Sequence, residues 1–177
     1  ILNARLTQEE INDIATEIQE YKDLPIYIDE SGSADFIRTL RSIRNMVARY
    51  GVQLVVIDYL QIYTQTGNNS EESLGRYARE AKNIARELNI AVMLLSQLNR
   101  SAAHPSIRML RGSGQIEEAC DTAVLVYRPF VYGIERYKDS TLTFGTAQLT
   151  IAKGRNIGLA QEVVAFNGEL TYFYDRD

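Results

Sequence analysis

The stretch Leu54–Gln61, with the sequence LVVIDYLQ, most constrains what this chain can fold into. It opens with four apolar residues in a row, three of them β-branched, and then reaches the carboxylate of Asp58. A continuous apolar run predicts a strand buried on both faces, as in a parallel sheet covered by helices. Because ligands bind outside the carboxyl ends of the strands in open α/β sheets, Asp58 stands where a ligand would be bound.

Two interpretations of Asp58 remain open on this stretch alone. In the first, it is a Walker B aspartate that holds Mg²⁺ on a nucleotide, usually through water. In the second, it caps a turn or a helix after a core strand. The stretch supports both about equally, so other parts of the chain must decide between them.

Length and composition narrow the classes of protein to which this chain could belong. The chain has 177 residues, 45% of them apolar, which is enough for one core and predicts a single domain over residues 1–177. A net charge of −4 excludes a uniformly basic nucleic-acid-binding protein, so any such contact must be local. The single cysteine, Cys120, excludes an internal disulfide and fits a reducing compartment, from which we expect a cytoplasmic protein.

The sequence also lacks an apolar run of membrane-spanning length and a signal peptide, so we expect no membrane association. It begins at Ile1 in the middle of a pattern, from which we expect the chain to be part of a longer protein.

The first half of the chain alternates between strand and helix patterns. Helical periodicity follows the capping box Thr7–Glu10 and recurs over residues 34–50 and 74–88, with the turn at residues 31–33 as the expected N-cap of the second helix. Gly51 and Asn89 are the expected ends of the second and third helices. Apolar runs at residues 26–28, 54–57 and 91–95 predict strands. This alternation is typical of βαβ units and predicts a parallel sheet.

The last third follows a different pattern. Residues 99–115 have no usable period and predict a long loop of the kind that is usually functional. After a helical turn at residues 116–119 and an apolar strand at 122–127, short strands are expected at 146–152, 161–166 and 170–174. Asn167-Gly168 between the last two is a strong hairpin signal. The predicted fold class is therefore α/β, a mainly parallel sheet flanked by helices, with antiparallel C-terminal strands.

Polar groups follow three of the predicted strands. Asp58 follows the first, Gln97 follows the next, and Lys153-Gly154-Arg155-Asn156 follows a later one. Phosphoryl transfer needs such a set, because a carboxylate positions the metal, an amide contacts the γ-phosphate or the attacking water, and cations neutralise developing charge.

Four motifs, in this order, resemble the C-terminal motor domain of the bacterial replicative DNA helicases, the DnaB-type hexamers of RecA-like fold. The resemblance covers nearly the whole chain. The motifs are Val56–Gln61, Leu95–Arg100, Arg111–Glu117 with Asp121, and Ala152–Asn156.

The resemblance implies a role for each matched residue. Asp58 would be the Walker B residue on Mg²⁺ and the nucleotide, and Gln97 the sensor of the γ-phosphate. Arg155 would be an arginine finger that reaches the neighbouring subunit's nucleotide, with Lys153 beside it. A loop facing the central channel would grip the phosphates of single-stranded DNA; its residues are Arg111, Gly112, Ser113 and Gly114. The implied cofactors are ATP and Mg²⁺, and the implied partners are single-stranded DNA, five further copies in a hexamer, primase and a helicase loader.

The chain departs from the family pattern in three places. Gly112 stands where the family usually has glutamate, and Ile157-Gly158 stands where it often has Gly-Pro. No G-x-x-x-x-G-K-[ST] phosphate loop occurs. The resemblance places that loop, and the glutamate that activates water, upstream of Ile1. We therefore expect residues 1–177 alone to be inactive and to bind ATP weakly.

Other chemistry-bearing residues have simpler interpretations. We expect Asp121 to be structural, Cys120 to be a small buried residue, and His104 not to bind metal because it has no partner ligands at suitable spacing. Two alternative functions remain: a RecA/RadA-type recombinase, and a RecA-like module that binds DNA or protein without hydrolysis. A phosphate loop encoded upstream would separate the second from a motor.

Overall fold

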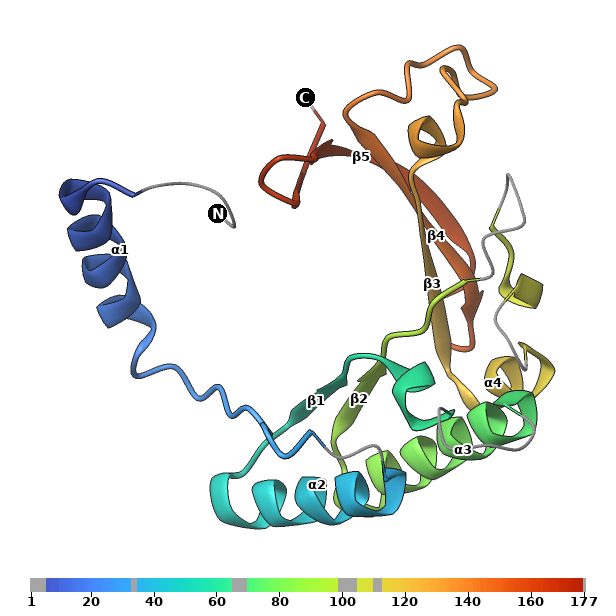
Figure 1. Ribbon diagram of the computed structural model, residues 1–177. Coiled ribbons are helices and arrows are strands. Elements are labelled where there is room, and N and C mark those ends of the chain that lie inside the picture. Colours follow the sequence, from blue (N-terminus) through green and yellow to red (C-terminus); the bar gives the residue numbers. More distant parts are fainter. Residues whose placement is uncertain (1–5, 33–34, 65–69, 99–104, 110–112, 177) are drawn as a thin grey trace. The chain divides into compact units, whose positions relative to one another are not determined.

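The computed structural model describes residues 6–32, 35–64, 70–98, 105–109 and 113–176. Backbone contacts divide the chain into two compact units, Ile1–Gly32 and Ser33–Asp177. Figure 1 shows the order of the helices and strands. The expectation of one domain over the whole chain stays a prediction, and each unit is described by itself.

The first unit contains one helix, α1 (Gln8–Tyr21), among its described residues. The predicted capping box is confirmed, because the Glu10 backbone N–H donates to Thr7 Oγ1 (3.3 Å) and the Thr7 N–H donates to Glu10 Oε2 (2.7 Å). The apolar stripe of this helix, which includes Ile11, Ile14 and Ile18, is exposed.

The strand predicted at residues 26–28 is wrong. These residues have an irregular backbone, and Ile26 and Ile28 are strongly exposed. The described residues provide no neighbouring strand for them, and a β-strand requires a partner to satisfy its backbone N–H and C=O groups.

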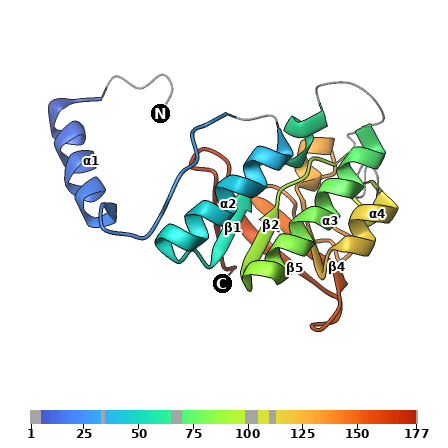
Figure 2. The ribbon, with the colours of Figure 1, turned by 90° about the horizontal axis from the view of Figure 1, so that it is seen from below.

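The second unit begins with a helix–sheet layer. Strand β1 (Leu54–Ile57) pairs in parallel with β2 (Ala91–Leu94), from Leu54 opposite Ala91 to Ile57 opposite Leu94. The helices α2 (Phe36–Tyr50) and α3 (Ser70–Leu88) lie side by side on one face of this sheet (Figure 2). The parallel βαβ arrangement expected from the alternating pattern is thus confirmed.

Local signals set the ends of these helices. Asp35, and not the predicted turn at residues 31–33, caps α2, since its carboxylate accepts from the Ile37 N–H at 2.9 Å. Gly51 ends α2 in the left-handed conformation at a φ of 67°, as predicted. Asn89 follows α3 with a φ of 52°, which also agrees with the prediction.

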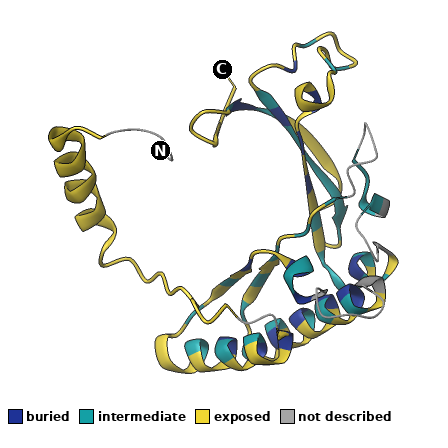
Figure 3. Cartoon of the chain, in the orientation of Figure 1, coloured by how far each residue is buried: buried dark blue, intermediate teal, exposed yellow. Residues whose placement is uncertain are grey.

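The core of this unit lies between the helices and the sheet (Figure 3). Its buried residues come from both helices, from the end of β1, from the short helix η1 (Leu60–Thr64) and from α4 (Ser113–Ala119). They are Phe36, Leu40, Ile43, Ile57, Leu60, Tyr63, Leu74, Ala78, Ala81, Ile84 and Ile116.

The prediction that β1 is buried on both faces is wrong for this chain. Val55 and Ile57 pack against the helix-side core, whereas Leu54 and Val56 are 54% and 53% exposed. Because successive side chains of a strand point to opposite faces, the helices α2 and α3 bury only every second residue. An apolar run thus shows that both faces suit burial, but not that this chain covers both.

The C-terminal part of the unit is an antiparallel sheet in the order β3-β4-β5-β6. The strands are β3 (Thr122–Tyr127), β4 (Thr146–Gly154), β5 (Ala160–Asn167) and β6 (Tyr172–Tyr174). The short helix η3 (Pro129–Tyr132) lies between β3 and β4, whereas η2 (Ile107–Met109) precedes α4 and β3. The hairpin expected at Asn167 is confirmed, with its side chain accepting from the N–H groups of Glu169 (2.9 Å) and Leu170 (3.1 Å). The α/β class with antiparallel C-terminal strands is therefore correct.

Candidate functional site

The parallel pairing of β1 and β2 places Asp58 and Gln97 at the same edge of the sheet. Backbone hydrogen bonds continue beyond the strands, because Leu95 N–H donates to the Ile57 carbonyl (3.0 Å) and Leu60 N–H donates to the Leu95 carbonyl (2.9 Å). The two strand ends are therefore fixed relative to each other. This shared edge is where an open α/β sheet binds its ligand.

Asp58 is exposed directly after β1, and the peptide bond between it and Tyr59 is cis. Within the described part of the chain, its carboxylate forms no hydrogen bond or ion pair. A cap interaction, the alternative interpretation of this residue, is thus not seen among those residues. Mg²⁺ on a nucleotide is commonly bound by one or two protein carboxylates, while phosphates and water supply its other ligands. An exposed carboxylate at a strand end is suited to that role.

Gln61 fixes the backbone that carries Gln97. Its Nε2 donates to Ser96 Oγ (2.8 Å) and to the Gln97 carbonyl (3.2 Å), and its Oε1 accepts from the Gln97 N–H (3.3 Å). Gln97 itself is exposed. This role of Gln61 was not predicted, although an amide between Leu60 and Ile62, three residues after Asp58, is a detectable signal.

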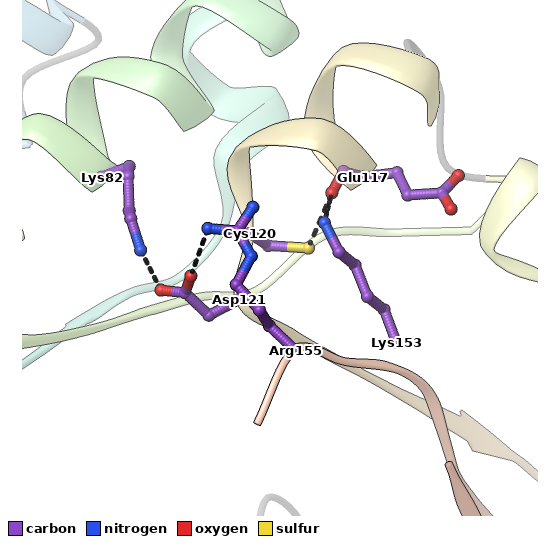
Figure 4. A network of polar contacts seen from close by, with 6 residues as sticks. All are labelled: Lys82, Glu117, Cys120, Asp121, Lys153 and Arg155. Carbon is purple, nitrogen blue, oxygen red and sulfur yellow. Dashed lines mark hydrogen bonds and ion pairs between the residues drawn. The ribbon is translucent and has the colours of Figure 1, made fainter. Parts of the chain in front are cut away.

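A second polar group lies where β4 ends and β3 begins (Figure 4). The Arg155 backbone N–H donates to the Asp121 carbonyl (2.9 Å), and Arg155 Nη1 contacts Asp121 Oδ1 (3.3 Å). The other carboxylate oxygen of Asp121 accepts from Lys82, which comes from α3. Asp121 thus joins Lys82 to Arg155, and nothing in the sequence pattern indicates that Lys82 belongs to this group.

These contacts change the acidity of Asp121. The hydrogen bond from Lys82, with a further contribution from the positive charges of Lys82, Arg155 and Lys153, holds the pKa of the Asp121 carboxyl below its usual value. The Arg155 side chain remains 55% exposed, so it is not buried against its own core.

Lys153 points to the C-terminal part of α4, where its ammonium group donates to the Glu117 carbonyl (Figure 4). The same carbonyl is near Cys120 Sγ at 3.5 Å. Cys120 is half-buried, and this burial raises the pKa of its thiol. The structure therefore brings Lys153 and Arg155 together at one end of β4, where Lys153 contacts α4 and Arg155 contacts Asp121 directly before β3.

The predicted residues form two groups. Asp58 and Gln97 share one sheet edge, and Lys153 and Arg155 share one end of β4. No hydrogen bond or ion pair joins the two groups within the described ranges.

The predicted DNA-binding loop lies partly outside the described residues, which exclude Arg111 and Gly112. Ser113 and Gly114 are the first residues of α4, and Gly114 is exposed. His104 also lies outside the described residues.

Among the described residues, none of the helices has both the length and the apolar character needed to cross a membrane. No cluster of three or more histidine, cysteine, aspartate or glutamate side chains that could hold a metal ion occurs among the same residues.

Curated relatives are replicative DNA helicases. The protein named replicative DNA helicase DnaB of Leifsonia xyli subsp. xyli is 34% identical over 160 residues, which are 86% of this chain and 34% of that protein. The protein of the same name from Pasteurella multocida is 34% identical over 157 residues, or 84% of this chain and 32% of that protein. The chain thus spans about a third of the length of the curated relatives it matches.

Solved structures support the fold. A DnaB-like replicative helicase, described together with its interactions with primase, aligns with a TM-score of 0.75 and 26% identity over 98% of this chain and 43% of that chain. A second solved structure, an ATPase domain, aligns with a TM-score of 0.79 over 98% of this chain and 62% of that chain, and at 24% identity it supports the fold alone. These neighbours confirm the RecA-like fold.

A family model described as the DnaB-like helicase C-terminal domain matches residues 1–175. The match runs through both units of the chain and includes all four motifs quoted above. The chain therefore belongs to the DnaB-like helicase C-terminal domain family.

Proposed function

We propose that this chain is the C-terminal part of an ATP-dependent replicative DNA helicase and that residues 1–177 belong to a single motor domain. The complete protein would move along single-stranded DNA as a hexameric ring and unwind the duplex at a replication fork. The observation that carries the proposal is the placement of Asp58 and Gln97 at one edge of the parallel pair β1–β2. In a RecA-like motor, that edge is where the triphosphate is bound.

Asp58 and Gln97 would divide the work at this edge. Asp58, exposed and without a partner among the described residues, would hold Mg²⁺ through water. Bound Mg²⁺ would neutralise charge on the phosphates of ATP. Gln97, on a backbone fixed by Gln61, would hold its amide where the γ-phosphate of ATP is bound and would report the loss of that phosphate.

Arg155 would act on the nucleotide of the neighbouring subunit, with Lys153 as a second cation. A finger supplied in trans accelerates phosphoryl transfer by about 10³–10⁵-fold in systems where it has been measured. Such a dependence on the neighbour makes the ring, and not the single subunit, the working unit. The exposed guanidinium of Arg155 leaves it accessible to another chain.

Arg111, Gly112, Ser113 and Gly114 would face the central channel and bind the phosphates of single-stranded DNA. Glycine at position 112 leaves its backbone N–H accessible to a phosphate even though a side-chain contact is lost. Primase and a helicase loader would be further partners. The protein would act in the cytoplasm, where Cys120 would stay reduced.

The test is the Arg155→Ala variant of the complete protein. We expect it to lose ATP hydrolysis while it keeps nucleotide binding, because the nucleotide is held by the other subunit. Arg49→Ala is a matched control, since Arg49 is an exposed arginine on α2 outside both groups. Retained hydrolysis in Arg155→Ala would remove the finger assignment. A wild-type protein that binds ATP without hydrolysing it would favour a non-hydrolysing module.

A further inference from the structure

Arg155 is attached to Asp121 at two points. The backbone N–H of Arg155 donates to the Asp121 carbonyl, and its Nη1 contacts the Asp121 carboxylate. The backbone bond fixes where the arginine leaves the sheet, and the side-chain contact limits the directions in which the guanidinium can point. Because a free arginine side chain samples many rotamers, the two attachments restrict the conformations that Arg155 can adopt.

Asp121 is itself held by the helical core of the unit. Lys82 of α3 binds the carboxylate oxygen that Arg155 does not use, and its side chain is only 28% exposed. Directly before Asp121, the Cys120 N–H donates to the Ile116 carbonyl at 3.1 Å, and Ile116 belongs to the core. Asp121, and through it Arg155, is therefore positioned by the helices α3 and α4, which we call the α3–α4 layer.

The short helix α4 is closely fitted to α3. Arg79 of α3 donates to Gln115 Oε1 of α4 at 2.9 Å. Gly75 allows this approach, because a Cβ atom at that position would collide with Oε1, Cβ and Cδ of Gln115. Helix α4 and the Asp121 that follows it thus have little room to move relative to Lys82.

The hairpin that carries Arg155 offers less support of its own. Arg155 lies in the turn between β4 and β5, where Ile157 and Leu159 are exposed by 63% and 74%. An exposed turn of this kind cannot fix a long side chain by packing. The contacts with Asp121 supply the missing restraint.

We propose that Asp121, fixed by Lys82, is the positioning residue of Arg155 and holds its guanidinium in the direction that the neighbouring subunit's nucleotide requires. This inference rests on the proposed function of Arg155 as a finger. It adds that the direction of the Arg155 guanidinium is set by the α3–α4 layer of its own subunit. The group keeps one net positive charge, because Lys82 and Arg155 together outweigh the single carboxylate. A single Nη1 contact at 3.3 Å also leaves the rest of the guanidinium for phosphate oxygens.

The experiment measures steady-state ATP hydrolysis by the complete protein with saturating single-stranded DNA. The variants are Asp121→Asn, Arg155→Ala and the double variant. We expect Asp121→Asn to lower kcat by about 10- to 100-fold, the loss typical of a misplaced catalytic group, with the KM for ATP unchanged. In the Arg155→Ala background it should have no further effect, because Asp121 acts only through Arg155.

Three results would overturn the proposal. The first is a wild-type kcat in Asp121→Asn while Arg155→Ala is inactive, which removes the positioning role and leaves the finger. The second is that Asp121→Asn lowers kcat by the same factor in the wild-type and in the Arg155→Ala protein. Asp121 would then support the fold and would not act through Arg155. The third is a wild-type kcat in Arg155→Ala, which removes the finger and the positioning with it.

A charge swap separates positioning from stability. Lys82→Glu combined with Asp121→Lys keeps an ion pair between α3 and β3 but places a cation beside Arg155. We expect this variant to regain the Tm lost in Asp121→Asn without regaining kcat. Recovery of both would contradict the proposal. Glu87→Gln, which breaks the ion pair between Arg44 of α2 and Glu87 of α3, is the matched control and should keep wild-type kcat.

Discussion

The Gln61 side chain makes a reciprocal pair of hydrogen bonds with the Gln97 backbone, donating to its carbonyl at 3.2 Å and accepting from its N–H at 3.3 Å. This amide joins the segment after β1 to the segment after β2, on which the proposed γ-phosphate sensor stands. The two strand ends are thus connected beyond the last pair of the β-ladder, at the point where a bound triphosphate would need them to stay in register.

Replacing Gln61 with methionine should release Gln97. The side chain keeps its length and loses its hydrogen bonds, so the free energy of unfolding should fall by about 1 kcal/mol. In the complete protein, kcat should fall about tenfold because the sensor is no longer aligned. Gln148→Met is the control: Gln148 also uses its amide in a hydrogen bond, but with Thr150 of its own strand β4, at 3.1 Å. Equal kcat values for the two variants would count against a sensor positioned by Gln61.

A methyl group at position 75 should destabilise the fold. An alanine in a helix interior normally stabilises relative to glycine by about 1 kcal/mol, but here its Cβ would collide with Gln115 and force α4 away from α3. Such overpacking costs about 1–3 kcal/mol. Gly114→Ala on α4 is the control, because nothing lies within 4 Å of a Cβ there and the substitution should stabilise or leave stability unchanged. Urea unfolding measures the change in the free energy of unfolding for each variant. A Gly75→Ala protein more stable than wild type would show that α4 can move freely.

The stability contributed by Asp121 should depend on pH. Its pKa is lowered from the ordinary value of 3.8, chiefly by the hydrogen bond from Lys82. A carboxylate of lowered pKa stabilises the folded state at pH values above its unfolded pKa, and this stabilisation is lost as the pH falls through the folded pKa. The Asp121 side chain is 47% exposed, so solvent screening limits the effect to at most about 1 kcal/mol.

The comparison of wild type with Asp121→Asn checks this dependence. The difference in Tm between them should be constant from about pH 7 to pH 5 and should shrink below about pH 4, where the unfolded chain begins to bind a proton at this carboxylate. It should disappear once the pH has fallen through the lowered pKa of the folded state. A difference that stays the same down to about pH 2 would mean that the carboxylate charge contributes nothing.

Arg111→Ala should weaken the binding of single-stranded DNA by the complete protein. Loss of one phosphate contact reduces the number of released counterions, so the slope of log K against log salt concentration should become shallower by about 0.7 per contact. Titrations at several salt concentrations measure this slope. An unchanged slope would indicate that Arg111 is a solvated loop arginine without contact to the DNA.

Short-range signals predicted much of the fold. The Thr7–Glu10 box, Gly51 and Asn89 act within a few residues of the helix end that they define, so the sequence contains their whole cause. The run Leu54–Ile57 likewise predicted a strand, and the alternation of strands and helices predicted parallel pairing.

The failures have a common physical origin, which is that the required partner is distant or absent. Residues 26–28 have strand-like side chains but no strand to pair with among the described residues. The apolar face of β1 that carries Leu54 and Val56 suits burial, yet α2 and α3 cover the other face. Propensity describes a segment alone, whereas pairing and burial depend on what lies next to it.

The candidate site shows the same limit. The sequence marked Asp58, Gln97, Lys153 and Arg155 because each follows an apolar run or matches a motif. Nothing in the spacing of Lys82, Asp121 and Arg155, which lie far apart in the chain, predicts that they meet at one carboxylate.

The most direct test uses rings assembled from two kinds of inactive subunit. Asp58→Ala and Arg155→Ala forms of the complete protein, each with its own affinity tag, are assembled together and purified through both tags. The account predicts that mixed rings hydrolyse ATP faster than rings of either variant alone, because some junctions combine an intact Asp58 with the intact Arg155 of the neighbour. Mixed rings no more active than their parents would contradict a site divided between Asp58 and Arg155 of adjacent subunits.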